Sequence, residues 1–161
     1  MILEYLDKLN MQYEMVNHEA VFTAEEAQKI KGLIKGVGCK NLFLKGDNNK
    51  YYLYLLEDNK KGNLKELEKI LQIKKLHFAT PEELKRILGL DKGGVTPLGI
   101  INDKDNLVIV IIDSNLKDKV LLMHPEVNTK TLALKYDDLL KYIKYLKHEY
   151  IIFEGELNGQ I

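Results

Sequence analysis

The 161-residue sequence has a single cysteine, only three prolines and no long apolar run. One cysteine, Cys39, excludes an intrachain disulfide and a zinc site built from several cysteines. No stretch reaches the roughly 18 apolar residues of a membrane-spanning helix. The first residues, Met1–Met11, also lack the basic start and the unbroken apolar run of a signal peptide. We therefore expect a folded cytoplasmic protein that does not associate with a membrane.

The sequence also lacks an excess of charge of either sign, because 24 acidic residues balance 24 basic residues. This balance argues against a protein that binds nucleic acid through bulk charge alone. Residues 27–46 nevertheless contain no acidic residue, and their basic residues are Lys29, Lys31, Lys35, Lys40 and Lys45. Such a stretch can attract phosphates, but it can equally be a solvated surface, which is the more common case. Both interpretations stay open on charge alone.

The composition is that of one globular unit, with 45% hydrophobic and 30% charged residues. We find neither a Ser/Gly-rich linker nor an internal repeat, so we predict a single domain over residues 1–161. A chain of this length buries roughly 70% of the surface that its unfolded form exposes. One substantial core is therefore expected.

Apolar spacing predicts a mixed arrangement of helices and strands. The runs Cys39–Lys45 and Tyr51–Glu57 flank four turn-forming residues and predict a β-hairpin. Leu107–Ile112, the most apolar run, predicts a central strand buried on both faces. Other segments predict strands at 13–17, 76–79, 120–123, 131–134 and 150–153, and helices at 2–9, 24–31, 64–71, 81–88 and 139–146. Because strands occur both in hairpins and between helices, we expect an α/β (α+β) fold with a mixed, largely antiparallel curved sheet surrounded by helices.

Two of these helices have clear start signals. Thr23 and Glu26 have the spacing of a capping box, in which each side chain bonds a backbone N–H at the helix start. Pro81 occupies the first helical position that proline favours.

Lys40 is the first candidate for chemistry. In a strand, alternation puts Lys40 on the face of Leu42 and Leu44, and Cys39 on the opposite face with Phe43. A lysine on an apolar face either extends to solvent from the strand end or lines a cleft, where its ammonium holds a phosphate or polarises a carbonyl. Both interpretations are open.

The second candidate is the glycine-rich loop Gly93–Gly99. Glycines permit backbone conformations that direct N–H groups at a ligand, as an oxyanion site requires. A plain turn needs glycine for the same steric reason, and on this segment alone the plain turn is the more common outcome.

The third candidate is the segment from His124 to Thr131, which gathers an imidazole, an amide and two hydroxyls between two strands. The alternative is a loop in which Asn128 and the threonines bond their own backbone. The remaining histidines have no metal-ligand spacing, and Cys39 has no visible triad partner, so we expect neither a metal nor a covalent cysteine intermediate. No cofactor is expected either.

Four segments taken together resemble the prolyl-tRNA editing-domain family, which includes free-standing aminoacyl-tRNA deacylases. They are His18–Thr23, Lys40–Leu44, the Gly93–Gly99 loop and His124-Pro125 with Asn128-Thr129. Their order and spacing are compatible with the family from about His18 to Ile152. The resemblance implies a hydrolase that acts in trans on mischarged tRNA(Pro), most closely alanyl-tRNA(Pro), with cysteinyl-tRNA(Pro) as the alternative substrate. A non-catalytic regulator that binds an aminoacyl group or tRNA is a further alternative.

The resemblance also assigns roles to residues. Lys40, Gly94, His124 and Asn128 correspond to the catalytic positions. The substrate-binding residues implied are Phe22, Thr23, Gly93, Val95, Thr96, Pro97 and Pro125. The tRNA-binding residues expected are Lys29, Lys31, Lys35 and Lys45. Aminoacylated tRNA(Pro) is the expected partner, whereas the sequence leaves open whether prolyl-tRNA synthetase is needed as well and whether the protein forms a dimer.

Overall fold

The computed structural model describes residues 1–19, 29–30, 32–127 and 129–154. The structure is organised around a hairpin of β2 (Val37–Gly46) and β3 (Tyr51–Glu57), whose strands pair antiparallel. The N–H of Gly46 donates to the carbonyl of Lys50, and Asn49 turns the chain at φ 65°. Asparagine enters this left-handed region more readily than most residues with a side chain. The predicted hairpin is confirmed.

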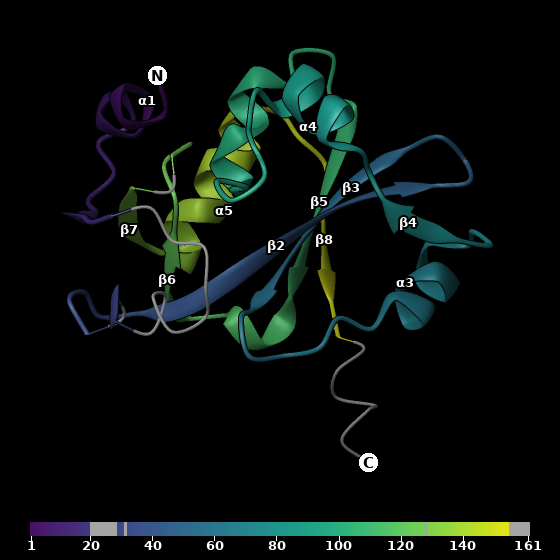
Figure 1. Cartoon of the computed structure of the whole chain (residues 1–161), viewed down its shortest axis with the longest axis horizontal. Coiled ribbons are helices and arrows are strands. Elements are labelled where there is room, and N and C mark those ends of the chain that lie inside the picture. Colours follow the sequence, from purple (N-terminus) through teal and green to yellow (C-terminus); the bar gives the residue numbers. More distant parts are fainter. Residues whose placement is uncertain (20–28, 31, 128, 155–161) are drawn as a thin grey trace.

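Eight strands in the described part of the chain form one sheet, in the order β1-β7-β6-β2-β3-β5-β8 with β4 also paired to β2 (Figure 1). The other strands are β1 (Glu14–Asn17), β4 (Leu76–Phe78), β5 (Val108–Asp113), β6 (Val120–Met123), β7 (Lys130–Lys135) and β8 (Tyr150–Phe153). Antiparallel ladders join β2 to β3 and β4, and β7 to β1 and β6. The pairs β2–β6, β3–β5 and β5–β8 are parallel. The predicted mixed, largely antiparallel sheet is thus confirmed.

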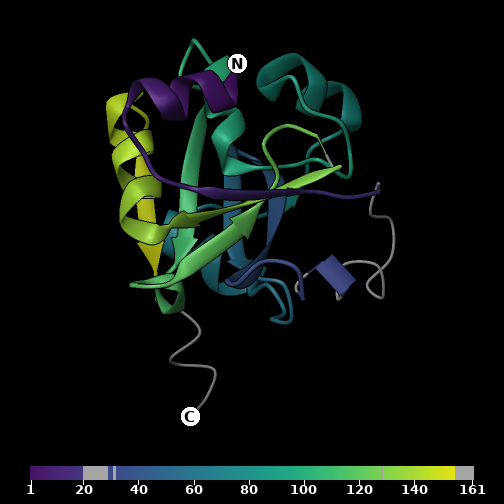
Figure 2. The ribbon, with the colours of Figure 1, turned by 90° about the vertical axis from the view of Figure 1, so that its left-hand side faces the viewer.

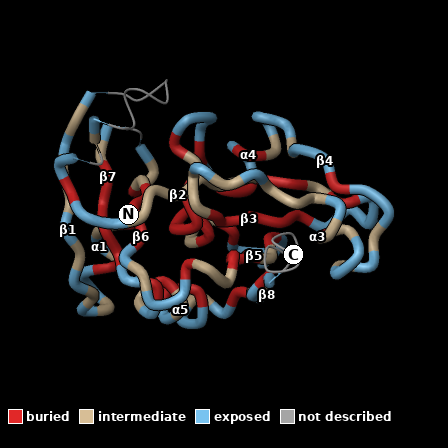
Figure 3. Tube along the Cα trace, turned by 90° about the horizontal axis from the view of Figure 1, so that it is seen from below, coloured by how far each residue is buried: buried red, intermediate tan, exposed pale blue. Residues whose placement is uncertain are grey.

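The sheet separates two apolar clusters. Leu53 and Val110 belong to the larger cluster, whereas their neighbours Tyr54 and Ile111 belong to the smaller cluster. Figure 3 shows β3 and β5 buried along the middle of the molecule, while β1 at the edge is exposed or half-buried. The predicted central strand at Leu107–Ile112 is confirmed, because β5 lies between β3 and β8 with apolar residues on both faces.

The helices cover both faces unequally. They are α1 (Ile2–Lys8), α3 (Leu64–Leu71), α4 (Pro81–Leu88), α5 (Tyr136–Tyr145) and the short 3-10 helices η1 (Pro97–Asn102) and η2 (Ser114–Leu116). α1, α4, η1 and α5 contribute to the larger cluster, and α3 packs on the smaller one. In Figure 2, α1 crosses one end of α5, where the rings of Tyr5 and Tyr142 meet edge to face at 5.7 Å. Among the described residues, no helix has the length and apolar character to cross a membrane.

The start of α4 follows the sequence signal. The hydroxyl of Thr80 accepts from the N–H of Glu83, and the Glu83 carboxylate accepts from the N–H of Thr80, with Pro81 at the first position. This capping box fixes where the chain passes from β4 into α4. The other predicted capping box, Thr23 with Glu26, and most of the predicted helix 24–31 lie outside the described residues.

The glycine-rich segment is more regular than the sequence suggested. Its second half is not an open loop, because η1 begins at Pro97 and continues to Asn102. Thr96, which is fully buried, caps this helix by accepting from the N–H of Leu98 at 3.3 Å. A proline whose φ already suits a helix and a threonine cap before it explain the helical start.

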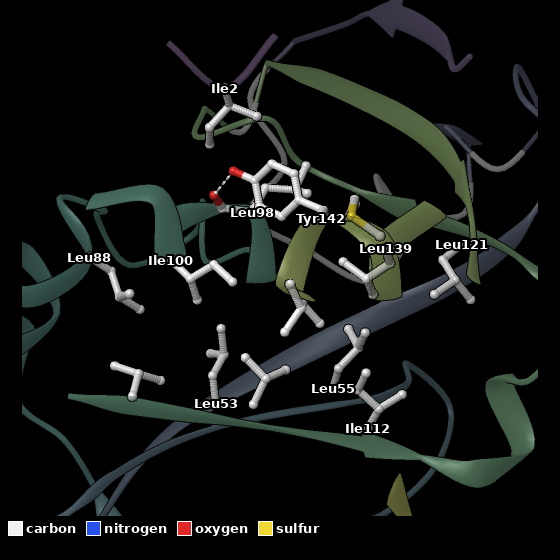
Figure 4. Close-up of a cluster of buried hydrophobic side chains, with 14 of the residues drawn as sticks. Ile2, Leu53, Leu55, Leu88, Leu98, Ile100, Ile112, Leu121, Leu139 and Tyr142 are labelled. Atoms are coloured by element: carbon white, nitrogen blue, oxygen red, sulfur yellow. Dashed lines mark hydrogen bonds between the residues drawn. The ribbon is translucent and has the colours of Figure 1, made fainter. Parts of the chain in front are cut away.

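A buried hydrogen bond joins η1 to α5. Tyr142 is fully buried and donates its hydroxyl to the carbonyl of Leu98 at 2.5 Å (Figure 4). The same side chains pack against Ile100 and Leu139 in the larger cluster. The bond therefore ties the segment that follows the glycine-rich loop to the C-terminal helix.

Replacing Tyr142 by phenylalanine should lower the free energy of unfolding by about 1–3 kcal/mol, because a buried carbonyl loses its donor. Tyr145→Phe is the matched control, since Tyr145 is 57% exposed on the same helix. Urea unfolding of both variants and the wild type measures the difference. Equal stabilities of the two variants would show that the Leu98 contact does not stabilise the fold.

Candidate active site

A cavity of about 610 Å³ lies beside β2. This volume falls within the range of small-molecule sites. Its walls come from β2, the β4–α4 junction, the glycine-rich loop, the end of β6 and the start of β7, and they include Cys39, Lys40, Asn41, Phe43, Thr80, Leu84, Gly93, Val95, Met123, His124 and Thr131. Predicted site residues from three separate segments, Lys40, Gly93 with Val95, and His124, thus meet at one cavity.

Lys40 is one of the β2 residues that line this cavity. Strand alternation holds as predicted, because Phe43 packs in the larger cluster and Leu44 in the smaller one. Lys40 itself is half-buried and lines the cavity. None of the described acidic residues forms an ion pair with its ammonium. Alternation puts its side chain on the strand face opposite to Cys39 and Phe43, which line the same cavity.

Asn41 links β2 to the glycine-rich loop, and the sequence reasoning did not select it. Its Nδ2 donates to the carbonyl of Val95 at 3.2 Å, and its Oδ1 is buried without a partner among the described residues. An amide on the same strand face as Cys39 and Phe43 was the available signal, because a buried polar group normally has a bonding partner. This bond fixes the loop against the strand that carries Lys40.

Only the first part of the glycine-rich loop lines the cavity. Gly93, at φ 112°, and Val95 line the wall. Gly94 is buried, and its N–H donates to the carbonyl of Asp91 at 3.0 Å, so this N–H already has an acceptor. Within the described part of the chain, the N–H groups of Gly93 and Val95 have no acceptor. Thr96 and Pro97 are buried behind the loop, where they start η1.

His124 lies at the end of β6, on another wall of the cavity. Its Nδ1 is 2.8 Å from the carbonyl oxygen of Lys130. Burial lowers the pKa of His124 below its ordinary value, and the nearby His18 adds to this effect, while the Lys130 carbonyl opposes it. The imidazole is therefore uncharged at neutral pH, with one nitrogen committed to the backbone.

Thr131, one of the two hydroxyls in the candidate segment from His124 to Thr131, lies on this wall, and its partner His18 received no role from the sequence. Thr131 lines the cavity on β7, one residue beyond the last ladder pair between β6 and β7. Its Oγ1 is 2.8 Å from Nε2 of His18, whose ring lies 6.3 Å from the ring of His124. His18 and Thr131 are 113 residues apart in sequence, so only the β1–β7 pairing brings them together.

The predicted phosphate-binding lysines differ in their surroundings. Lys29 and Lys35 are exposed. Lys45 instead pairs with Glu83 at 3.0 Å. The N–H of Thr80, the hydroxyl of Tyr51 and the Lys45 ammonium together lower the pKa of Glu83 to about 2, so this carboxylate stays charged. Lys45 therefore contacts the start of α4 through Glu83 and helps to hold the β4–α4 junction against β2.

Among the described residues, Pro125 is a predicted site residue that does not line the cavity. Pro125 is buried next to His124. Four other predicted residues lie outside the described residues: Phe22, Thr23, Lys31 and Asn128.

Cys39 lines the cavity without the properties of a nucleophile. Burial, together with the carboxylates of Asp58 and Glu57, raises the pKa of its thiol to about 12. Its Sγ lies 3.4 Å from the carbonyl oxygen of Val37. Because the thiolate is the reactive form, this cysteine is inert at neutral pH. In the described ranges, no cluster of three or more His, Cys, Asp or Glu side chains could hold a metal ion.

Comparison with known proteins identifies the class. Residues 18–142 match the aminoacyl-tRNA editing domain family. The prolyl-tRNA editing protein ProX of Acetoanaerobium sticklandii is 36% identical over 147 residues, which cover 89% of this chain and 88% of that protein. Prolyl-tRNA synthetase associated domain-containing protein 1 of Danio rerio is 30% identical, with 92% and 83% covered. The chain belongs to the aminoacyl-tRNA editing domain family.

The fold comparison agrees with this membership. The crystal structure of a candidate trans-editing enzyme for prolyl tRNA synthetase matches with a TM-score of 0.69 at 22% identity, over 88% of this chain and 86% of that one. At this identity the likeness shows a shared fold. Membership in the family confirms the resemblance found in the sequence and the predicted enzyme class, an aminoacyl-tRNA deacylase.

Cys39 offers a direct test of the cavity's electrostatics, because it is the only cysteine. We expect iodoacetamide at pH 8 to label the native protein at least about tenfold more slowly than the urea-unfolded protein, since a raised pKa suppresses the thiolate. Mass spectrometry over time gives both rates. Cys39→Ala should retain deacylation. Rapid native labelling together with an inactive Cys39→Ala variant would instead indicate a nucleophilic thiolate.

Proposed function

We propose that this protein hydrolyses alanyl-tRNA(Pro) in trans, by attack of water on the ester between the amino acid and the terminal ribose. The observation that carries the proposal is the convergence of Lys40, the Gly93–Val95 backbone and His124 on one cavity of ligand size. The name of the ProX relative, a prolyl-tRNA editing protein, supports the same tRNA.

Physical limits on recognition explain why such an enzyme is needed. A site that accepts proline cannot exclude a smaller amino acid by contact, and one methylene discriminates by only about 1–3 kcal/mol. A second site with the opposite size preference removes the error. Its pocket must admit alanine and exclude the pyrrolidine ring of proline.

The cavity walls suit such a size filter because they are tied together. Asn41 bonds the Val95 carbonyl, and the capping box of Thr80 and Glu83 fixes the opposite edge. Forcing a larger ring into a rigid site costs on the order of 1–3 kcal/mol. In this proposal, these bonds keep the cavity walls in place and so disfavour the pyrrolidine ring of prolyl-tRNA.

We assign Lys40 to the terminal nucleotide or the ester region, where its ammonium would stabilise developing negative charge. We assign the carbonyl contact to the backbone of Gly94 and its neighbours, and among these the N–H groups of Gly93 and Val95 have no acceptor in the described part of the chain, whereas that of Gly94 donates to Asp91. His124 and Asn128 shape the amino-acid pocket. The proposed substrate-binding region also includes Phe22 and Thr23. The buried residues Thr96, Pro97 and Pro125 would support this region from behind.

For the tRNA body, the proposed phosphate contacts are the exposed residues Lys29 and Lys35, together with Lys31, which is proposed from the sequence alone. Lys45 is the weakest member of this set, because it is paired with Glu83. Prolyl-tRNA synthetase is a proposed partner, in line with the printed name of the Danio rerio relative.

Two other functions make different predictions. A cysteinyl-tRNA(Pro) deacylase would cleave the cysteinyl ester and spare the alanyl ester. A regulator that only binds aminoacyl-tRNA would leave every ester intact. Lys40 has no ion-pair partner among the described residues, and we take this half-buried lysine to favour catalysis over binding alone, because a cation at the site stabilises the charge that appears during ester cleavage.

Lys40→Met should lower deacylation by a factor on the order of 100, the usual loss when one charge-stabilising donor is removed from an active site. The methionine keeps most of the apolar stem, so the fold should persist. Lys141→Met is the control, because Lys141 is an exposed lysine on α5, outside the cavity. Rates on alanyl-tRNA(Pro) and circular dichroism spectra of both variants are compared. Equal rates for Lys40→Met and wild type would refute the assigned role.

Single-turnover hydrolysis of alanyl-, cysteinyl- and prolyl-tRNA(Pro) tests the function itself. We expect the alanyl ester to be cleaved about 5- to 150-fold faster than the prolyl ester, since this ratio corresponds to the steric cost of about 1–3 kcal/mol. Cleavage of only the cysteinyl ester would assign the protein to the alternative substrate. Stability of all three esters would assign it to the binding class.

A further inference from the structure

The hydrogen-bond directions on the His124 wall are determined by the backbone. A carbonyl oxygen can only accept, so Nδ1 of His124, at 2.8 Å from the Lys130 oxygen, must carry a hydrogen. In an uncharged imidazole the other nitrogen then has a lone pair and no hydrogen. Among the described residues nothing donates to Nε2 of His124. Within the described part of the chain, this nitrogen is therefore an acceptor without a donor, on a residue that lines the cavity.

The same reasoning fixes the hydroxyl of Thr131. Nδ1 of His18 is 2.7 Å from the carbonyl oxygen of Glu19, so this nitrogen also carries a hydrogen. When His18 is uncharged, its Nε2 has only a lone pair, and at 2.8 Å it must accept the hydroxyl hydrogen of Thr131. The hydroxyl donor is then used, and Thr131 presents only lone pairs to the cavity.

His124 and Thr131 thus present two acceptors at the cavity, and no donor among residues 1–19, 29–30, 32–127 and 129–154 bonds to Nε2 of His124. A hydroxyl or carbonyl of a ligand cannot satisfy both, because a hydroxyl supplies one hydrogen and a carbonyl supplies none. A primary ammonium supplies three hydrogens and a positive charge, and bonds from a charged donor are the stronger class. In an aminoacyl ester the α-ammonium is the group with this chemistry.

We propose that Nε2 of His124 and Oγ1 of Thr131 bind the α-ammonium of the esterified amino acid, and that His18 is a positioning residue that keeps Thr131 an acceptor. This inference rests on the proposed function, since it assigns a subsite for the same substrate. It gives the pocket a second criterion besides size: the free amino group orients the ester toward Lys40 and the Gly93–Val95 backbone.

Paired substrates and paired variants test the subsite. Nitrous acid converts alanyl-tRNA(Pro) to its 2-hydroxypropanoyl ester, which keeps the methyl group and the ester but replaces the ammonium by a hydroxyl. Thr131→Val removes the hydroxyl at nearly constant shape, and Thr131→Ser retains it. We expect Thr131→Val to lower kcat/KM on the alanyl ester on the order of tenfold, and on the hydroxy ester less than about threefold. Thr131→Ser should resemble wild type on both.

The substrate dependence separates the proposal from its alternatives. If Thr131 positions the attacking water or only supports the fold, Thr131→Val lowers the rates on both esters equally, and this outcome overturns the proposal. His18→Ala should cause the same selective loss as Thr131→Val, to a smaller extent, because the Thr131 hydroxyl is then free to rotate. An equal loss on both esters would remove His18 from the assigned role.

Binding distinguishes failure of the subsite from failure of the proposed function. Two stable amides are titrated calorimetrically against wild type and Thr131→Val at pH 8. One is 3′-(alanylamino)-3′-deoxyadenosine, and in the other a hydroxyl replaces the α-amino group of the alanyl part. Preference of wild type for the ammonium form, reduced in Thr131→Val, supports the subsite even if no ester is hydrolysed. Absence of that preference, or of binding, overturns it. Nitrogen-15 spectra should show the Nδ1–H form of His124, and an Nε2–H form would also overturn the proposal.

Discussion

The strand β2 is the constraint on which the remaining structure depends. Its first residues pair parallel with β6, and the rest pairs antiparallel with β3 and β4, so both parts of the sheet meet on one strand. Because side chains alternate along a strand, Phe43 and Leu44 pack into different apolar clusters. A shift of one residue would exchange the two faces and expose the core side chains. The position of Lys40 at the cavity is therefore fixed by the packing of the whole sheet.

The strongest sequence signals were those that act within one element. The hairpin turn, the proline and capping box at α4, and the apolar run of β5 each depend on neighbours a few residues away, and each was found from sequence. The 3-10 helix at Pro97 was missed because it is short and has no apolar period. Its start signals, Thr96 and Pro97, were read as parts of a loop.

The candidate site was predictable in its segments but not in its contacts. The resemblance named Lys40, the glycine-rich loop and His124, and the structure brings these together. It could not show that the Gly94 N–H is already bonded to Asp91, because that depends on the path of the loop. The pairing of Lys45 with Glu83 is equally invisible in sequence, since 38 residues separate them and the register of β4 on β2 brings them close. Here tertiary register, which local patterns do not encode, determines whether a lysine is free.

A size filter needs walls that hold their spacing to a fraction of an ångström, and apolar packing alone does not give that directionality. In this cavity each wall is instead joined to the backbone by a polar side chain: Asn41 to Val95, Glu83 to Thr80 and His124 to Lys130. Hydrogen bonds have narrow preferred lengths and angles, so they fix orientation where dispersion contacts tolerate sliding. The same bonds also decide which atoms remain free for a ligand. Nδ1 of His124 donates to the carbonyl oxygen of Lys130, so Nε2 of the uncharged ring can only accept a hydrogen bond. The same contacts therefore hold the pocket walls in place and decide which donors a ligand must bring.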